Sequence, residues 1–136
     1  MKKLTIIALS MAAMISACKK TDVSPTPETT QQKILGSWAL KTTISNEFNN
    51  GQNYRDTFYW PQGNTIDFKR NNKVYFYENG MSDSSTYGIL TETKIWIEDP
   101  TEVYDITKLT AHEFQIYQKI INGTNQYVEG TVNMAR

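Results

Sequence analysis

Apolar and polar residues alternate along almost the whole chain from Ile34 onward. Trp38 and Leu40 flank Ala39, and Phe114 and Ile116 flank Gln115 in the same way. A period of two is typical of strands that bury one face, whereas a helix repeats about every 3.6 residues. The pattern predicts nine strands, near residues 37–44, 54–59, 64–69, 73–78, 85–90, 93–98, 102–108, 113–120 and 126–134.

Residue pairs that favour tight reversals separate these strands. Asn71-Asn72, Asn79-Gly80 and Asn122-Gly123 accept the positive φ values that short turns require. No segment after residue 36 shows a helical stripe. Short strands with turns between them predict an all-β fold, an antiparallel barrel or a sandwich.

The register that turns Trp38 inward also predicts the rest of the core. It buries Leu40, Ile66, Phe68, Val74, Phe76, Ile89, Ile95, Ile97, Ile106, Phe114 and Ile116. The interior of an eight-stranded barrel is either filled by side chains or holds one small ligand. Because these side chains are large, we expect a mostly filled barrel with at most a shallow mouth.

The first 17 residues form a pattern of their own. Lys2 and Lys3, an apolar stretch and small residues are the three parts of a secretory signal peptide. The stretch has roughly 12 apolar positions, too few for a membrane-spanning helix of about 20. Ile15-Ser16-Ala17-Cys18 resembles the lipobox of bacterial lipoproteins, which implies cleavage before Cys18 and lipid on its thiol. An ordinary secretory signal or an uncleaved anchor are the alternatives.

A polar segment separates this signal from the strands. Residues 19–33 have a single aliphatic residue, Val23, and hold Pro25 and Pro27 among polar and charged side chains. Such a composition buries too little apolar area to offset the entropy of ordering. We therefore expect residues 18–33 to be a lipid anchor and flexible linker, and residues 34–136 to be one domain; an ordered strap is the alternative for the linker.

Removal of the signal peptide changes the charge balance. From Cys18 onward the chain has 12 basic and 14 acidic residues, with no basic stripe. This composition argues against a nucleic-acid partner. Cys18 is the single cysteine, so the domain has no internal disulfide and depends on its hydrophobic core.

Several segments together resemble lipocalin-like domains. Gly36-Ser37-Trp38 is similar to the Gly-x-Trp signature that opens the first lipocalin strand. Ile66-Asp67-Phe68, Lys73-Val74-Tyr75-Phe76 and Tyr104-Asp105-Ile106 are similar to small lipocalin-like lipoproteins of the Bacteroidetes. The resemblance implies an up-and-down barrel of about eight strands that carries a ligand.

The chain also departs from the lipocalin pattern. It has no secure counterpart of the family's Thr-Asp-Tyr motif between later strands, and it lacks the C-terminal helix. Lipocalins place an arginine near the chain end to pack over the signature tryptophan; Arg136 is the final residue of this sequence, and a disordered end is the alternative to such a contact. Ligand carriage therefore does not follow from the resemblance alone.

Aromatic residues recur at positions that alternate with the expected core. They are Tyr75, Tyr77, Trp96, Tyr117 and Tyr127. On an outward face such rings offer a contact platform for sugars or protein partners. Cross-strand packing of the rings is the alternative, since such pairs are common in sheets. The 58–61 cluster is either a further contact point or the plug of a loop.

Residues suited to catalysis are sparse. His112 is the single histidine, and no nucleophile motif accompanies it. Glu98, Asp99, Glu102 and Asp105 are close in sequence but lack the glycine-punctuated spacing of a calcium loop, which favours a solvated hairpin end. We expect no metal, no cofactor and no enzyme activity.

These observations lead to two main functional hypotheses, and a hydrolase of unknown type is a third, much weaker alternative. The first is a lipid-anchored envelope lipoprotein that binds a small hydrophobic or glycan ligand, with Tyr75, Tyr77, Trp96 and Tyr117 as candidate contact residues. The second is a structural or protein-interaction lipoprotein of the envelope with a filled core and no small-molecule ligand. In both, lipid on Cys18 holds the protein at the outer membrane, with the periplasmic face favoured over the cell surface.

Overall fold

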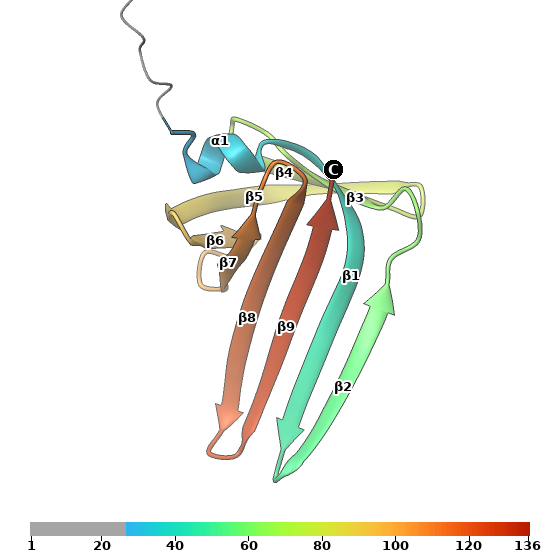
Figure 1. Ribbon diagram of the computed structural model, residues 1–136, viewed down its shortest axis with the longest axis vertical. Helices are drawn as coiled ribbons and strands as arrows, with labels where there is room; N and C mark the ends of the chain where they lie inside the picture. Colours follow the sequence, from blue (N-terminus) through green and yellow to red (C-terminus); the bar gives the residue numbers. More distant parts are fainter. Residues whose placement is uncertain (1–26) are drawn as a thin grey trace, which may run out of the picture.

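The computed structural model describes residues 27–136 as one short helix and nine antiparallel strands (Figure 1). Cys18, the expected signal peptide and most of the expected linker lie outside the described residues. In chain order the elements are α1 (Thr30–Ile34), β1 (Gly36–Asn49), β2 (Gln52–Tyr59), β3 (Thr65–Phe68), β4 (Lys73–Glu78), β5 (Met81–Thr91), β6 (Lys94–Ile97), β7 (Val103–Leu109), β8 (Glu113–Gly123) and β9 (Gln126–Ala135).

Eight of these strands close into a barrel. From β3 to β9 each strand pairs with the next along the chain, and β1 pairs with both β3 and β9. The ninth strand, β2, lies outside the barrel and pairs with β1 alone. The prediction of an all-β antiparallel barrel is therefore confirmed, and each expected strand has its counterpart.

The strands differ widely in length, and this difference shapes the molecule. β1 has 14 residues and β8 has 11, whereas β3 and β6 have four each. The long strands continue past the barrel as a four-stranded sheet (Figure 1). We call it the projecting sheet; it consists of 44–49 of β1, 52–57 of β2, 118–123 of β8 and 126–131 of β9.

The barrel interior is filled along most of its length. Every residue expected in the core is buried there or packs against it. The core also contains Ile34, Tyr87 and Met134, which the list of expected core residues did not include. The buried Tyr87 hydroxyl has a hydrogen-bond partner, because it donates to the carbonyl of Lys69 at 2.8 Å. The Tyr87 ring packs edge-on against the Phe68 ring.

One end of the barrel is closed around Trp38. Its side chain has no exposed surface, and its indole N–H donates to the carbonyl of Ile34 at 2.7 Å. The guanidinium of Arg136 lies 3.8 Å from the centre of the Trp38 ring and donates to the carbonyls of Ile34 and Leu35. The final residue of the sequence is therefore ordered and packs over Trp38. We call this region the closed end.

Helix α1 corrects the boundary expected between linker and domain. Residues 30–33, assigned to the flexible linker, are helical, and Thr30 is buried. The Thr30 hydroxyl lies 2.8 Å from the carbonyl of Glu92 and 2.7 Å from its carboxylate, and Thr29 caps the helix. These anchoring contacts are polar, so the lack of apolar residues misled the prediction. Within residues 27–136, no helix is long and apolar enough to cross a membrane.

Candidate binding site at the barrel mouth

The end of the barrel opposite α1 is open. Here β1 and β9 continue into the projecting sheet, and the short strands stop. A cavity of about 240 Å³ opens at this end, and we call it the mouth. Its walls are mainly apolar and aromatic and include Leu40, Trp60, Phe76, Ile97, Tyr104 and Val132.

Trp60 forms the wall of the mouth nearest the projecting sheet. It directly follows β2, and its backbone N–H donates to the carbonyl of Lys41 at 3.0 Å. Its indole N–H donates to the Thr43 hydroxyl at 2.9 Å, and the Phe58 ring meets it edge-on at 5.0 Å. Both contacts hold the ring in place. The 58–61 cluster therefore contributes Trp60 to the mouth.

Asn64 ties the rim of the mouth together. It is buried, and its carbonyl accepts the N–H of Leu40 at 3.0 Å. Its side-chain oxygen accepts the N–H of Asn79, also at 3.0 Å. One residue thus links β1 to the turn between β4 and β5. This link fixes the position of Glu78, which precedes the turn and lines the mouth.

The rim of the mouth is acidic. Glu78 and Glu98 line the cavity, and both also line an adjoining depression of about 480 Å³ that includes Asp83. Burial, followed by the negative charges of Glu102 and Glu98, raises the pKa of the Tyr104 phenol above its usual 10.0. The phenol therefore stays neutral at physiological pH, and the mouth combines neutral aromatic walls with a negatively charged edge.

Glu98 occupies an uncommon backbone conformation. Its φ is 69°, in the left-handed region that side chains other than Gly, Asn and Asp rarely adopt. Its N–H donates to the carbonyl of Thr86 at 2.8 Å, which fixes the chain directly after β6. The chain therefore carries a carboxylate at a position where glycine would fit with less strain.

The aromatic residues expected to form one platform are distributed around the barrel. Tyr75 and Tyr77 lie on β4, Trp96 on β6 and Tyr117 on β8, and β5 and β7 separate these strands. Of the four, Tyr77 lines the mouth. Trp96 covers Gly88, where an added Cβ would lie 2.4 Å from the indole nitrogen. Trp96 thus packs across strands, as the alternative interpretation proposed.

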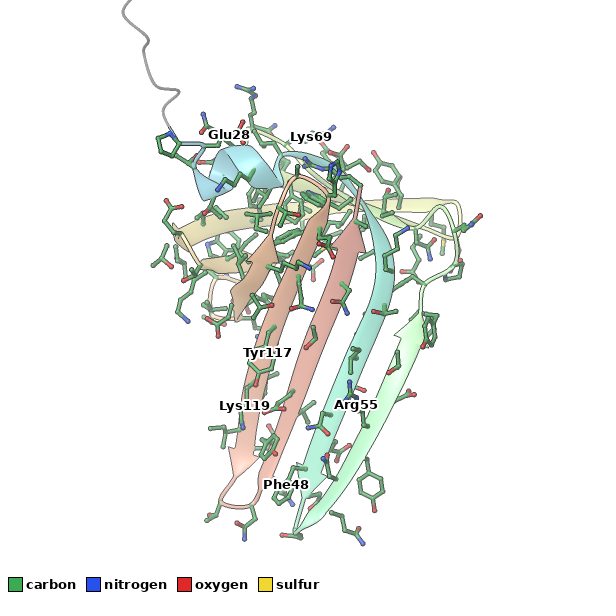
Figure 2. The ribbon with its side chains drawn as sticks, in the orientation of Figure 1. Glu28, Phe48, Arg55, Lys69, Tyr117 and Lys119 are labelled. Atoms are coloured by element: carbon green, nitrogen blue, oxygen red, sulfur yellow. The ribbon has the colours of Figure 1, made fainter. Side chains whose placement is uncertain are left out.

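Tyr117 belongs to a different site, a polar groove on the outer face of the projecting sheet (Figure 2). The groove measures about 240 Å³ and also contains Arg55 and Glu129. Lys119 donates to Glu129 at 3.0 Å and lies 3.7 Å from the centre of the Tyr127 ring. Hydrogen bonds from Lys119 and then Asn46 hold the pKa of Glu129 below its ordinary 4.5.

Sequence reasoning did not assign Glu78, Glu98, Trp60 and Tyr104 to one site. Each lies at or beside the end of a different strand, β2, β4, β6 or β7, and the four span residues 60 to 104. Their common signal is position: they occupy the strand ends that face away from Trp38. This signal becomes visible once the strand order is known.

The described residues contain no obvious metal site. Among residues 27–136, no group of three or more His, Cys, Asp or Glu side chains is arranged to hold a metal ion. Gly36 and Trp38, the residues of the expected signature, lie at the closed end rather than at the mouth. Comparison of the chain with protein-family models, with curated proteins and with solved structures gave no significant match.

Proposed function

We propose that this chain is a lipid-anchored binding protein of the cell envelope whose barrel mouth takes a small apolar ligand. One observation carries the proposal: the barrel is filled around Trp38 but stays open at the other end, where apolar and aromatic side chains face a cavity. Removing such surface from water stabilises a complex by about 25 cal/mol per Å² of apolar area. Binding, rather than catalysis, is the activity we propose.

The size of the mouth limits how a ligand binds. Its volume of about 240 Å³ is below the roughly 300–1,000 Å³ typical of sites that enclose a ligand. One ring or a short alkyl segment therefore enters, and the rest of the ligand lies along the adjoining depression. The apolar walls favour a hydrophobic group over a sugar, because sugar hydroxyls need polar partners when buried.

The proposed anchor is compatible with an accessible mouth. The described chain begins at Pro27 beside α1, at the closed end, and the turns of the projecting sheet lie at the far end (Figure 1). Lipid on Cys18 would thus tether the closed end and leave the mouth facing away from the bilayer. The periplasmic face of the outer membrane is the proposed location.

The resemblance to lipocalin-like lipoproteins is part of the same proposal. Its support is the contact between Trp38 and Arg136, since lipocalins pack an arginine near the chain end over the signature tryptophan. The closed eight-stranded barrel is compatible with such a domain. The lipocalin resemblance suggests a ligand at the open end, which is where the mouth lies.

The anchor and the ligand require separate tests. Cys18→Ala should remove lipid labelling and release the protein from the membrane fraction; unchanged membrane partition without labelling would overturn the anchor. For the ligand, we would record native mass spectra of protein purified from its own envelope. We expect an apolar small molecule to co-purify with the wild-type protein. The Val132→Phe variant, in which the larger side chain fills the mouth, should lose this molecule. The control variant Tyr59→Phe, which changes an exposed ring, should retain it. Equal retention by both variants would overturn the proposal.

A second function is favoured by the free edges of the projecting sheet. The outer edge of β2 has no strand partner, and β8 extends past its last pairing with β7 at Tyr117. Unpaired strand edges are templates for pairing with another chain. Docking to an envelope protein would then be the activity. A photo-crosslinking residue that replaces Tyr54 should capture one stoichiometric partner protein in the native envelope. If no partner is captured, the result would argue against docking.

A further inference from the structure

The charged side chains of residues 27–136 that line the mouth and the adjoining depression are all acidic. Glu78 and Glu98 line both the mouth and the adjoining depression, and Asp83 lines the depression. Among residues 27–136, no lysine, arginine or histidine lines either space. Carboxylates are negatively charged at neutral pH, so an apolar cavity is bordered by negative charge without a compensating cation from its own walls.

These carboxylates are also free of ion pairs with the rest of the described chain. Four ion pairs occur within residues 27–136, and none involves Glu78, Asp83 or Glu98. The four pairs are Lys69–Asp67, Lys94–Asp105, Lys108–Glu113 and Lys119–Glu129. Away from the mouth, four acidic residues of the described chain each form an ion pair with a lysine. At the mouth the negative charge is left available for a ligand.

The aromatic walls favour the same kind of ligand. Trp60, Phe76 and Tyr104 line the mouth, and the faces of such rings attract organic cations. The attraction strengthens as the cation loses water, which an apolar cavity promotes. Quaternary ammonium groups are recognised by aromatic rings in this way, and nearby carboxylates add to the attraction. An anionic ligand would instead meet repulsion from Glu78 and Glu98.

From these observations we infer that the mouth takes an organic cation, an ammonium group attached to an apolar body. The ammonium group lies between the aromatic walls and the carboxylates of Glu78 and Glu98. The apolar body contacts Leu40, Ile97 and Val132. This inference rests on the proposed function, because it names the chemical class of the ligand for the same site.

Three amphiphiles with one alkyl chain test this inference directly. Octyltrimethylammonium, octyl sulfate and octyl glucoside share an eight-carbon chain and differ in charge. We would measure the binding of each to the full chain by isothermal titration calorimetry, below their micelle concentrations. We expect the cation to bind about tenfold more tightly than the neutral glucoside, which corresponds to about 1.4 kcal/mol, and the sulfate to bind most weakly.

Matched variants assign the effect to the rim. Glu78→Gln/Glu98→Gln should reduce the affinity for octyltrimethylammonium about tenfold and leave that for octyl glucoside within about twofold. Both side chains are exposed, so the variant should keep the wild-type circular dichroism spectrum. The control variant Glu28→Gln/Glu113→Gln changes the net charge by the same amount, but Glu113 lies at the closed end. This control should leave the affinity for octyltrimethylammonium unchanged.

The outcomes separate the inference from the proposed function. Equal binding of all three amphiphiles at the mouth would overturn the cation inference and leave an apolar binding site in place. Tighter binding of the sulfate, or an equal loss in the two double variants, would also overturn the inference. Failure of all three amphiphiles to bind would overturn the proposed function itself.

Discussion

At the closed end the Trp38 ring is fully buried beneath Arg136, whereas at the mouth the Trp60 ring stays partly open to solvent. Both indoles donate hydrogen bonds from their N–H, to Ile34 and to Thr43 respectively. The difference lies in what covers the rings. Helix α1 and the chain end complete the first environment, and no part of residues 27–136 completes the second.

This contrast separates the aromatic residues of the barrel into a buried set and a partly exposed set. At the closed end, aromatic contacts are internal: the Phe114 ring lies 5.4 Å from Trp38 and 5.9 Å from Phe68. At the mouth, part of the aromatic surface has no protein partner among the described residues. Changes at the closed end should therefore lower the free energy of unfolding, and changes at the mouth should mainly lower ligand affinity.

The largest effect is expected from Trp38→Ala. Removal of a fully buried aromatic side chain costs about 3–5 kcal/mol of unfolding free energy, through lost burial and the cavity that remains. Urea denaturation followed by circular dichroism measures this loss. A cost below about 1 kcal/mol would mean that Trp38 is not the centre of the core. The affinity of the folded fraction for octyltrimethylammonium should change little.

A smaller loss of stability is expected from Arg136→Ala. The substitution removes the guanidinium from the Trp38 ring and from the carbonyls of Ile34 and Leu35. We expect a loss of about 1–2 kcal/mol by urea denaturation. Arg136→Lys keeps the charge without the planar donor group, so its loss should be intermediate. Wild-type stability in both variants would show that the chain end does not close the barrel.

Trp60→Ala should have the opposite profile. It removes a wall of the mouth, so we expect the affinity for octyltrimethylammonium to fall about tenfold. The free energy of unfolding should fall by less than in Trp38→Ala, because Trp60 is only partly buried. Calorimetric titration and urea denaturation of the same samples provide both values. An unfolding cost as large as that of Trp38→Ala would remove the distinction between the two ends.

The smallest effect concerns the outer face of the projecting sheet. Because hydrogen bonds from Lys119 and Asn46 lower the folded-state pKa of Glu129, this side chain stabilises the fold above its ordinary pKa of 4.5. That contribution is lost as the pH falls through the lower folded-state pKa. The urea midpoint of wild type should exceed that of Glu129→Gln at pH 7, and the difference should shrink on acidification. A difference independent of pH would contradict this account.

The barrel itself was predictable because its signal is local. Alternation along each strand depends on neighbours two residues apart, so Ile66 with Phe68 and Ile95 with Ile97 identified their strands and their inward faces. The full lengths of β1 and β2 were not predictable in this way. Residues 45–49 and 52–53 lie in the projecting sheet, where none of them is fully buried, so the sequence there does not need a run of alternating large apolar residues.

The mouth was not predictable because its signal is not local. Glu78 and Glu98 are 20 positions apart in the sequence, and they share a cavity only because β4 and β6 end on the same side of the barrel. Helix α1 escaped prediction for a related reason. Its anchor is a hydrogen bond from Thr30 to Glu92, which is 62 residues away.

The central claim is that ligands bind at the mouth and not at the closed end. Titration of isotopically labelled protein with octyltrimethylammonium, followed by amide chemical shifts, tests it most directly. We expect the largest shifts at Leu40, Ile97 and Tyr104, with the amides of Trp38 and Phe114 unchanged. The largest shifts at the closed end or on the projecting sheet, or no saturable shifts at all, would contradict the account.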